Sequence, residues 1–395
     1  MAIRTGDPEM AREINRALIL DLLRKNDAIP RAEMARMLDV SKVTVSTIVN
    51  DLIAQELVSE LGEGDSLKQG GRKPILLSLN VASKFVVGVD VGWQNTVVAI
   101  GNLKGALLAK TRAPTTRDHS VASIVEQVAS LIEDGIQRAQ IARPKILGCG
   151  LSVAGIVEKT TGRIAFSPDF NWREVPMTDL LQAKTGLRTI ADNCTRVMTR
   201  GEVWYGNARE VRNLFYINIG YGIGSAMVID GRMYDNHSEF GHVFVTKKDV
   251  RCDCGKHGCL EAVASGHAIE RLANEQIGNA NKGWLTAKEL AELADKGEAA
   301  AQNIFAEAGR YLGRMTSIVA NLFNPDKIII GGGVALSGHL MLDAILQEFA
   351  ENTMEVIKNH TAIEISALGM DAGVCGAVAL ALDAFVFKQA ILTHS

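Results

Sequence analysis

Three of the six cysteines and two histidines lie close together between Gly241 and Ser265. Cys252 and Cys254 are separated by one residue, Cys259 follows after four more, and His242 lies ten positions before Cys252. Three thiolates and one imidazole are the ligand types and number of a closed, tetrahedral zinc site. Glycines within the segment allow the tight turns that such a site needs. The sequence therefore predicts one structural Zn²⁺ held by His242, Cys252, Cys254 and Cys259.

Other interpretations of these cysteines are a disulfide cluster or unconnected buried thiols. A cytosolic chain does not normally keep disulfides, which favours the metal. His257 is the competing histidine. We prefer His242 because Glu239-Phe240-Gly241-His242 forms a compact, turn-like unit that also supplies a carboxylate. Cys149 and Cys375 lie in apolar surroundings and are most simply core residues.

The bulk composition describes an ordinary globular chain. Its 395 residues suffice for two or three domains, and 47% are hydrophobic and 22% charged. The net charge of −3 gives no global attraction to nucleic acid, so any DNA contact must come from a local patch. The first residues lack a signal-peptide core, and no apolar run reaches the roughly eighteen residues of a membrane span. We therefore expect a cytoplasmic protein with reduced thiols and no membrane insertion.

The first 80 residues have the pattern of a DNA-binding unit. Apolar spacing predicts helices over residues 9–27, 33–38 and 42–55, and Ser41 is a good N-cap for the last of them. Its inward stripe leaves polar residues on the outer, N-terminal part. This is the layout of a helix-turn-helix, in which the second helix meets base edges in the major groove. The predicted contacts are Ser41, Lys42, Thr44, Ser46 and Thr47.

Two short predicted strands, 57–61 and 75–79, would add a wing to these helices. The connection between them is flexible and basic, and it carries Lys68, Arg72 and Lys73. Such a strip suits phosphate or minor-groove contacts. A solvated, charged hairpin is the alternative. The unit as a whole is nearly charge-balanced, so binding should depend on these few residues and on dimerisation at a near-palindromic operator.

From residue 85 onward, short β-branched strands alternate with helices. Two strands around a glycine-containing turn, within 85–103, are followed by a similar pair within 214–231. A strand–glycine-turn–strand unit that occurs twice suggests a duplicated α/β fold with a ligand cleft between two lobes. Glycine turns at strand ends let backbone N–H groups approach a phosphate or a sugar.

The motif Cys252-x-Cys254-Gly255-x-x-Gly258-Cys259-x-Glu261, together with Glu239-x-Gly241-His242, resembles the ROK family of repressors, open reading frames and sugar kinases. The resemblance covers nearly the whole chain. It implies an α/β fold with a winged helix-turn-helix over residues 1–80, then an actin-like, ribonuclease-H-type fold of two lobes over residues 81–395. Family members that carry such a winged helix are transcriptional repressors controlled by sugars.

The resemblance also implies a sugar pocket. Carboxylates and a carboxamide suit a hexose, because each sugar hydroxyl can both donate and accept a hydrogen bond. The zinc would hold the loop 239–261 in place rather than attack a substrate, since four protein ligands leave no open position. The implied sugar-binding residues are Ser152, Gly155, Asn171, Asn193, Glu239, His242 and Glu261.

Three departures from the family's kinases indicate that phosphoryl transfer has been lost. Trp93 stands where the first phosphate loop of the kinases has a glycine, and Tyr221 interrupts the second glycine loop. Asn193 is followed by Cys194 where the kinases place the aspartate that acts as general base. A thiol of ordinary pKa is a poor substitute for that carboxylate. We therefore predict no catalytic residues and no enzyme activity.

The favoured function is a sugar-responsive repressor of carbohydrate uptake or metabolism genes, acting as a homodimer or a dimer of dimers. Two alternatives stay open. One is an ATP-dependent sugar kinase that also binds DNA. The other is a repressor sequestered by a protein partner from a sugar transport system, for which the C-terminal helix is a candidate surface.

Overall fold

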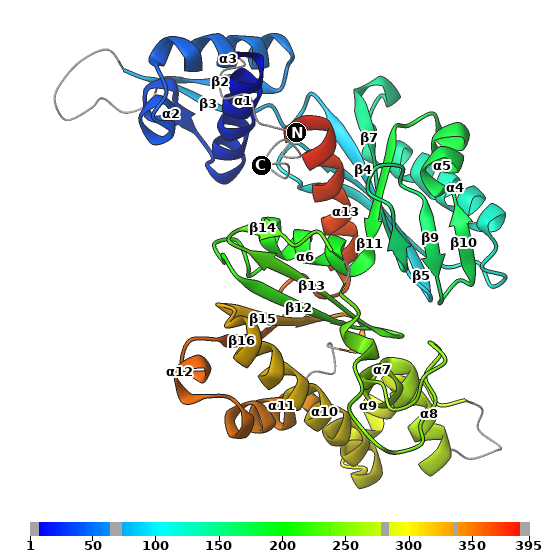
Figure 1. Cartoon of the computed structure of the whole chain (residues 1–395). Coiled ribbons are helices and arrows are strands. Elements are labelled where there is room, and N and C mark those ends of the chain that lie inside the picture. Colours follow the sequence, from blue (N-terminus) through cyan, green and yellow to red (C-terminus); the bar gives the residue numbers. More distant parts are fainter. Residues whose placement is uncertain (1–7, 64–72, 237, 278–283, 335–338, 388–395) are drawn as a thin grey trace.

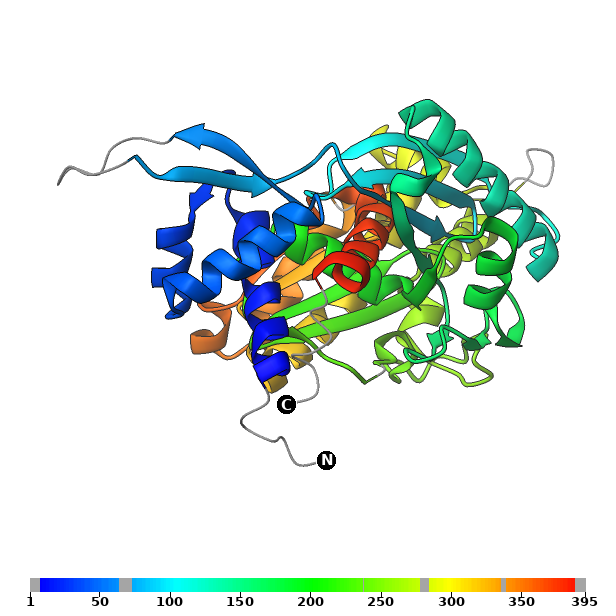
Figure 2. The ribbon, with the colours of Figure 1, turned by 90° about the horizontal axis from the view of Figure 1, so that it is seen from above.

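The computed structural model describes residues 8–63, 73–236, 238–277, 284–334 and 339–387. At the N-terminus, three helices pack with a small antiparallel sheet of strand order β1-β3-β2. The elements are α1 (Pro8–Lys25), β1 (Ile29–Pro30), α2 (Arg31–Leu38), α3 (Lys42–Ala54), β2 (Val58–Glu63) and β3 (Ile75–Leu79). We call these elements the N-terminal unit. In Figure 2 the β2–β3 hairpin extends away from the helices.

The turn between α2 and α3 follows from two residues. Asp39 ends α2 in the left-handed conformation, with φ of 53°. Ser41 caps α3, because its side chain accepts a hydrogen bond from the Thr44 backbone N–H at 3.0 Å. The predicted N-cap is confirmed. The inward face of α3 is buried as the spacing predicts, through Val45, Ile48, Val49 and Leu52.

The first lobe is built on a five-stranded sheet of order β11-β7-β4-β5-β6. Strands β4, β7 and β11 are parallel, β5 pairs antiparallel with β4, and β6 pairs antiparallel with β5. Helices α4 (Val121–Ala139) and α5 (Met177–Thr185) belong to this lobe, as does a small sheet of β8 (Ile156–Val157), β9 (Ile164–Ser167) and β10 (Trp172–Val175). The main strands are β4 (Phe85–Val91), β5 (Asn95–Asn102), β6 (Leu107–Pro114), β7 (Ile146–Val153) and β11 (Thr189–Asn193).

The second lobe repeats this sheet. Its order is β14-β13-β12-β15-β16. Strands β12, β15 and β16 are parallel, β13 pairs antiparallel with β12, and β14 pairs antiparallel with β13. The predicted duplication is confirmed, because order and strand directions match those of the first lobe. The strands are β12 (Leu214–Ile219), β13 (Ile223–Ile229), β14 (Arg232–Met233), β15 (Lys327–Gly331) and β16 (Ala362–Ile365). Its helices are α7 (Leu260–Ala264), α8 (Gly266–Gln276), α9 (Ala287–Asp295), α10 (Ala299–Phe323), α11 (His339–Asn352) and α12 (Glu355–Lys358).

Two helices connect the lobes, because each follows one lobe in the chain and contacts the other. Helix α6 (Cys194–Tyr205) continues from β11 of the first lobe but also contacts β12 and β13 of the second. Helix α13 (Ala372–Leu382) follows the second lobe but packs on β4, β7 and α6 (Figure 1). The two helices approach so closely that a Cβ on Gly376 would lie 1.9 Å from the carbonyl oxygen of Val197. Only glycine permits this crossing.

The end of α13 reaches the N-terminal unit. After Leu382 the chain forms a π-helical turn, Asp383–Phe387, whose Phe387 shares one buried cluster with Ile19 and Leu23 of α1. Figures 1 and 2 both place α13 next to α1. The helical segment Gly369–Phe387 is long and apolar enough to cross a membrane by length and composition, but 67% of that window is buried inside the structure. It therefore serves as a core helix here.

Candidate functional site

The predicted metal ligands converge. His242 lies in a short 3₁₀ turn, Phe240–His242, and the cysteines lie in the loop that leads into α7. Cys254 Sγ is 3.7 Å from Cys259 Sγ, and Cys252 Sγ is 3.7 Å from His242 Nδ1. All four ligand atoms lie within 4.8 Å of one another. A tetrahedron with Zn–S bonds of about 2.3 Å has edges of about 3.8 Å, so these residues fit a zinc ion.

The competing histidine lies elsewhere. His257 is exposed, and its Nδ1 contacts the carboxylate of Asp249. The choice of His242 over His257 therefore agrees with the cluster that the structure forms.

Glu261 joins this cluster to the second lobe's sheet. It lies in the first turn of α7, and its Oε2 accepts a hydrogen bond of 2.8 Å from the Ile223 backbone N–H. Its Oε1 lies 3.8 Å from His242 Nδ1, and the Glu239 carboxylate lies 3.9 Å from His242 Nε2. A Cβ on Gly222 would be 2.4 Å from Glu261 Oε2, so a side chain there would displace this carboxylate. The structure thus brings Glu239, His242 and Glu261 together.

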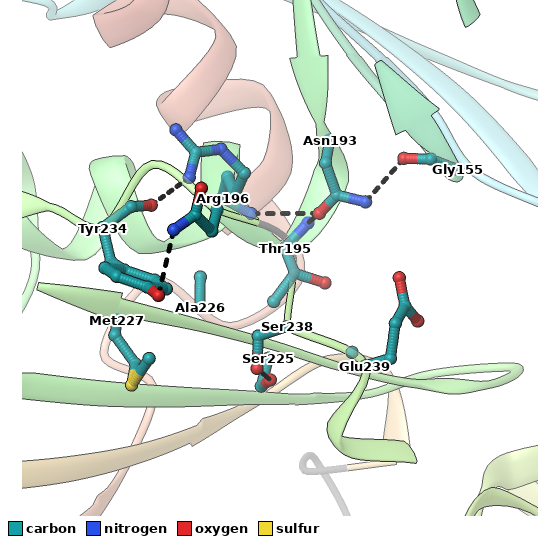
Figure 3. Close-up of a pocket in the computed structure, with 12 residues that line it drawn as sticks. Gly155, Asn193, Thr195, Arg196, Ser225, Ala226, Met227, Tyr234, Ser238 and Glu239 are labelled. Carbon is teal, nitrogen blue, oxygen red and sulfur yellow. Dashed lines mark hydrogen bonds between the residues drawn. The ribbon is translucent and has the colours of Figure 1, made fainter. Parts of the chain in front are cut away.

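Asn193 is held at the junction of β11 and α6. Its Oδ1 accepts hydrogen bonds from the backbone N–H groups of Thr195 at 2.9 Å and Arg196 at 3.3 Å. Its Nδ2 donates to the Gly155 carbonyl at 2.9 Å (Figure 3). Gly155 has φ of 118°, and a Cβ there would lie 2.5 Å from the Phe166 carbonyl oxygen. Asn193 is therefore both a helix cap and a fixed carboxamide at the site.

Asn193, Gly155 and Glu239 line one pocket between α6 and β13. Figure 3 shows the Glu239 carboxylate and the Asn193 amide on the same side of it. The sequence reasoning missed Arg196 and Tyr234 in this lining. Arg196 could have been found, because it follows the N-cap Asn193 by three positions on the first turn of a helix.

The two other predicted sugar residues lie in different settings. Ser152 is fully buried in β7, and its Oγ donates to Asp90 Oδ1 at 2.6 Å. Asn171 is exposed in a turn with φ of 54°, and its N–H donates to the Pro168 carbonyl. In the same turn, burial and the nearby Glu261 raise the pKa of Asp169 to about 6. Asp169 was missed, although it lies two residues before Asn171.

Aromatic rings fill the space between the two glycine loops. Trp93 of the first loop packs on Tyr221 of the second, with ring centroids 5.2 Å apart, and on His119 at 4.0 Å. The loop amides are occupied too. Gly92 N–H donates to the Asn95 carbonyl, and Gly220 N–H donates to the Gly222 carbonyl, both at 3.0 Å. The two loops therefore contact each other through the rings of Trp93 and Tyr221.

The residue after Asn193, Cys194, carries a half-buried thiol. Burial, with Asp90 and Asp169 nearby, raises the pKa of Cys194 to about 12. At neutral pH the thiol stays protonated and cannot accept a proton from a substrate hydroxyl.

The predicted DNA contacts lie on one end of α3. Ser41, Lys42 and Thr47 are exposed, and Thr44 and Ser46 are half-buried. Lys73 is exposed just before β3, and Lys68 and Arg72 lie outside the described residues. Val43, which sequence reasoning passed over because it is apolar, is 75% exposed on the same turn of α3.

The fold and the site together define the protein class. The sequence pattern of the ROK family matches residues 86–384, and the chain belongs to the ROK family. It shows the family's mixed α/β, actin-like architecture.

Individual relatives include both repressors and kinases. The chain is 28% identical to the xylose repressor of Caldicellulosiruptor bescii over 391 residues, which cover 96% of this chain and 98% of that protein. It is 32% identical to a glucokinase of Halalkalibacterium halodurans over 311 residues, covering 75% and 94%. A crystal structure of a ROK family transcriptional regulator, a homologue of the E. coli MLC protein, matches with a TM-score of 0.82 at 25% identity, covering 97% of this chain and 100% of that one.

Proposed function

We propose that this protein is a sugar-responsive transcriptional repressor of the ROK family. The observation that carries the proposal is a fixed polar site, made by Asn193, Glu239 and Glu261, in the same chain as a helical N-terminal unit. The full-length similarity to a xylose repressor and to a ROK regulator structure supports it, since the kinase relative aligns with only 75% of the chain.

The N-terminal unit is the DNA-binding part, a winged helix-turn-helix over residues 1–80. The exposed start of α3 enters the major groove, where Val43 adds an apolar contact suited to a thymine methyl group. The wing between β2 and β3 contacts the flanking backbone. A homodimer or a dimer of dimers binds two half-sites of an operator. The base contacts are Ser41, Lys42, Thr44, Ser46 and Thr47, and the wing contacts are Lys68, Arg72 and Lys73.

The remaining chain, residues 81–395, binds the sugar. The carboxylates of Glu239 and Glu261 and the amide of Asn193 hydrogen-bond its hydroxyls, and His242, Ser152, Gly155 and Asn171 complete the pocket. Zinc bound by His242, Cys252, Cys254 and Cys259 would fix the loop that carries these groups. The protein acts in the cytoplasm, where these thiols stay reduced.

Sugar binding reaches the DNA-binding part through the crossed helices. A sugar that binds one arrangement of the two lobes more tightly shifts the population toward that arrangement. Helix α13 passes from the lobes into the core of the N-terminal unit, where Arg16 Nη1 also donates to the Val386 carbonyl at 3.1 Å. A change in the arrangement of the two lobes is therefore transmitted through α13 to the DNA-binding surface.

The test is a DNA-binding titration. An operator is selected from a random-sequence pool with the full-length protein, and its anisotropy is followed while a panel of monosaccharides, N-acetyl sugars and phosphosugars is added. One member of the panel should release the DNA, and Glu239→Gln should shift its midpoint at least about tenfold. DNA binding that ignores every sugar in the panel would refute the proposal.

Two alternatives make different predictions. A sugar kinase would form ADP in a sugar-dependent way, which the protonated Cys194 thiol argues against. A repressor controlled by a transport protein would release DNA with membranes that contain that transporter and not with any free sugar.

A further inference from the structure

Carboxylates surround the proposed sugar site. Glu239 and Glu261 flank His242, and Asp90 lies half-buried near Cys194. Asp169 lies near Glu261 and Asp253, and these like charges add to burial in raising its pKa. Several carboxylates this close together disfavour the binding of a negatively charged ligand.

The cation in the pocket is already neutralised. Arg196 is 6% exposed, and its Nε donates to both oxygens of Asp192, at 2.9 and 3.1 Å. Its guanidinium also donates to the Tyr234 carbonyl and lies 3.6 Å from Asp235. Asp235 pairs with Lys159 of the first lobe as well. Among the described lining residues no other arginine or lysine is present, so a phosphate entering the pocket would meet no unpaired cation.

Several backbone N–H groups that could bind an anion already have partners. The N-terminus of α6 would suit a phosphate. The N–H groups of its second and third residues, Thr195 and Arg196, are instead bonded to Asn193 Oδ1. In the glycine loops, the N–H groups of Gly92 and Gly220 bond to carbonyls of their own loops, and aromatic rings fill the space between them.

The metal cluster adds no positive charge. Three thiolates and a neutral imidazole around Zn²⁺ carry a net charge of about −1. A phosphate therefore gains no attraction from the zinc that would be held beside Glu261.

From these contacts we propose that the effector of this protein is an uncharged sugar, and that the site discriminates against phosphorylated sugars. The inference rests on the proposed function and narrows its ligand class. A neutral sugar loses nothing to the surrounding carboxylates, since its hydroxyls can donate to all of them.

The experiment compares matched pairs on the full-length, zinc-loaded protein. Calorimetric titrations use glucose and glucose 6-phosphate, N-acetylglucosamine and its 6-phosphate, and xylose and xylose 5-phosphate. We expect at least one neutral sugar to bind and its phosphate to bind about 100-fold more weakly. A phosphosugar that binds as tightly as its neutral partner would overturn the inference while leaving the proposed function intact. If no member of any pair binds, both fail.

A charge-release variant sharpens the test. Asp235→Asn removes the carboxylate that Arg196 and Lys159 share at the rim of the pocket. It should tighten phosphosugar binding about tenfold relative to the neutral partner. The matched control is Asp230→Asn, an exposed aspartate of the same lobe that pairs with Arg212, which should change neither affinity. Equal changes for both members of the pair in Asp235→Asn would contradict the charge argument.

Discussion

The site has two sides that differ in what holds them. On the acidic side, Glu261 and Asn193 are fixed by backbone N–H and C=O groups and keep polar atoms for a ligand. On the aromatic side, the two glycine loops are closed on themselves, and Trp93 and Tyr221 fill the gap between them. In the proposed function, sugar recognition depends on the acidic side, while phosphoryl transfer would need the aromatic side, so variants on one side should affect only one of these properties.

The connection between the two sides is short. Gly220 and Tyr221 accept backbone hydrogen bonds through their carbonyls from Gly266 and His267 at the start of α8. Helix α8 follows α7, which carries Glu261. A change on the acidic side therefore reaches the aromatic loop within a few residues, and the following variants separate the two.

The largest effect is expected on the acidic side from loss of the metal ligands. Cys252→Ser or Cys259→Ser should abolish zinc binding, lower the free energy of unfolding by about 3 kcal/mol or more and remove the sugar response. Zinc content and sugar-dependent thermal shifts measure this. Cys375→Ser, outside the cluster, is the control. A sugar response that survives in a zinc-free variant would show that the metal does not support the acidic side.

The next effect concerns Asp90, a half-buried carboxyl group in β4, two residues before Gly92 of the first glycine loop. Burial raises the pKa of Asp90 to about 6. The folded protein therefore holds this proton more tightly than the unfolded chain. The group favours folding below about pH 4, and this contribution is lost as the pH rises through about 6. Between these values wild type should lose about 2 kcal/mol that Asp90→Asn does not. Urea unfolding of both proteins across this range gives the difference, and parallel curves would refute it.

A smaller effect should follow from crowding Glu261. Gly222→Ala places a Cβ 2.4 Å from Glu261 Oε2, so the carboxylate must move. Sugar affinity should fall about tenfold to 100-fold, or about 1.4 to 2.8 kcal/mol, with zinc content unchanged. Gly220→Ala is the matched control in the same loop, since the nearest atom to its Cβ lies 4.0 Å away. Equal losses in the two variants would mean that loop flexibility, and not the position of Glu261, governs affinity.

The smallest effect belongs to the aromatic contact. A double-mutant cycle of Trp93→Ala and Tyr221→Ala should give a coupling energy of about 1 kcal/mol in unfolding. The same cycle with Trp93 and Tyr234, from the pocket lining, should give a coupling near zero. No coupling between Trp93 and Tyr221 would mean that the contact between their rings does not contribute to the free energy of unfolding.

Local signals in the sequence predicted much of this structure. The cysteine spacing identified the cluster, and Ser41 indicated the N-cap that opens α3. The duplicated sheet followed from strand patterns that occur twice. In each case the information lies within one short segment, such as His242 to Cys259, or in a pattern that occurs twice.

Contacts between distant segments could not be predicted in this way. Trp93 and Tyr221 are far apart in the chain, and the residues next to each of them do not indicate that the two rings will be in contact. The ion pair of Arg196 with Asp235 likewise depends on how α6 lies against the second lobe. The C-terminal helix, α13, continues as a π-helical turn through Phe387, and the residues beyond lie outside those described.

The buried cluster that joins Phe387 to Ile19 and Leu23 also bears on how the chain is made. Its members extend from Ile19 to Phe387, so this cluster cannot close until the chain has been synthesised through Phe387. Truncated products would expose Ile19 and Leu23 to water, an apolar surface that favours aggregation or degradation. An intact core in the N-terminal unit therefore requires that both lobes have already been synthesised, because α13 follows them in the chain.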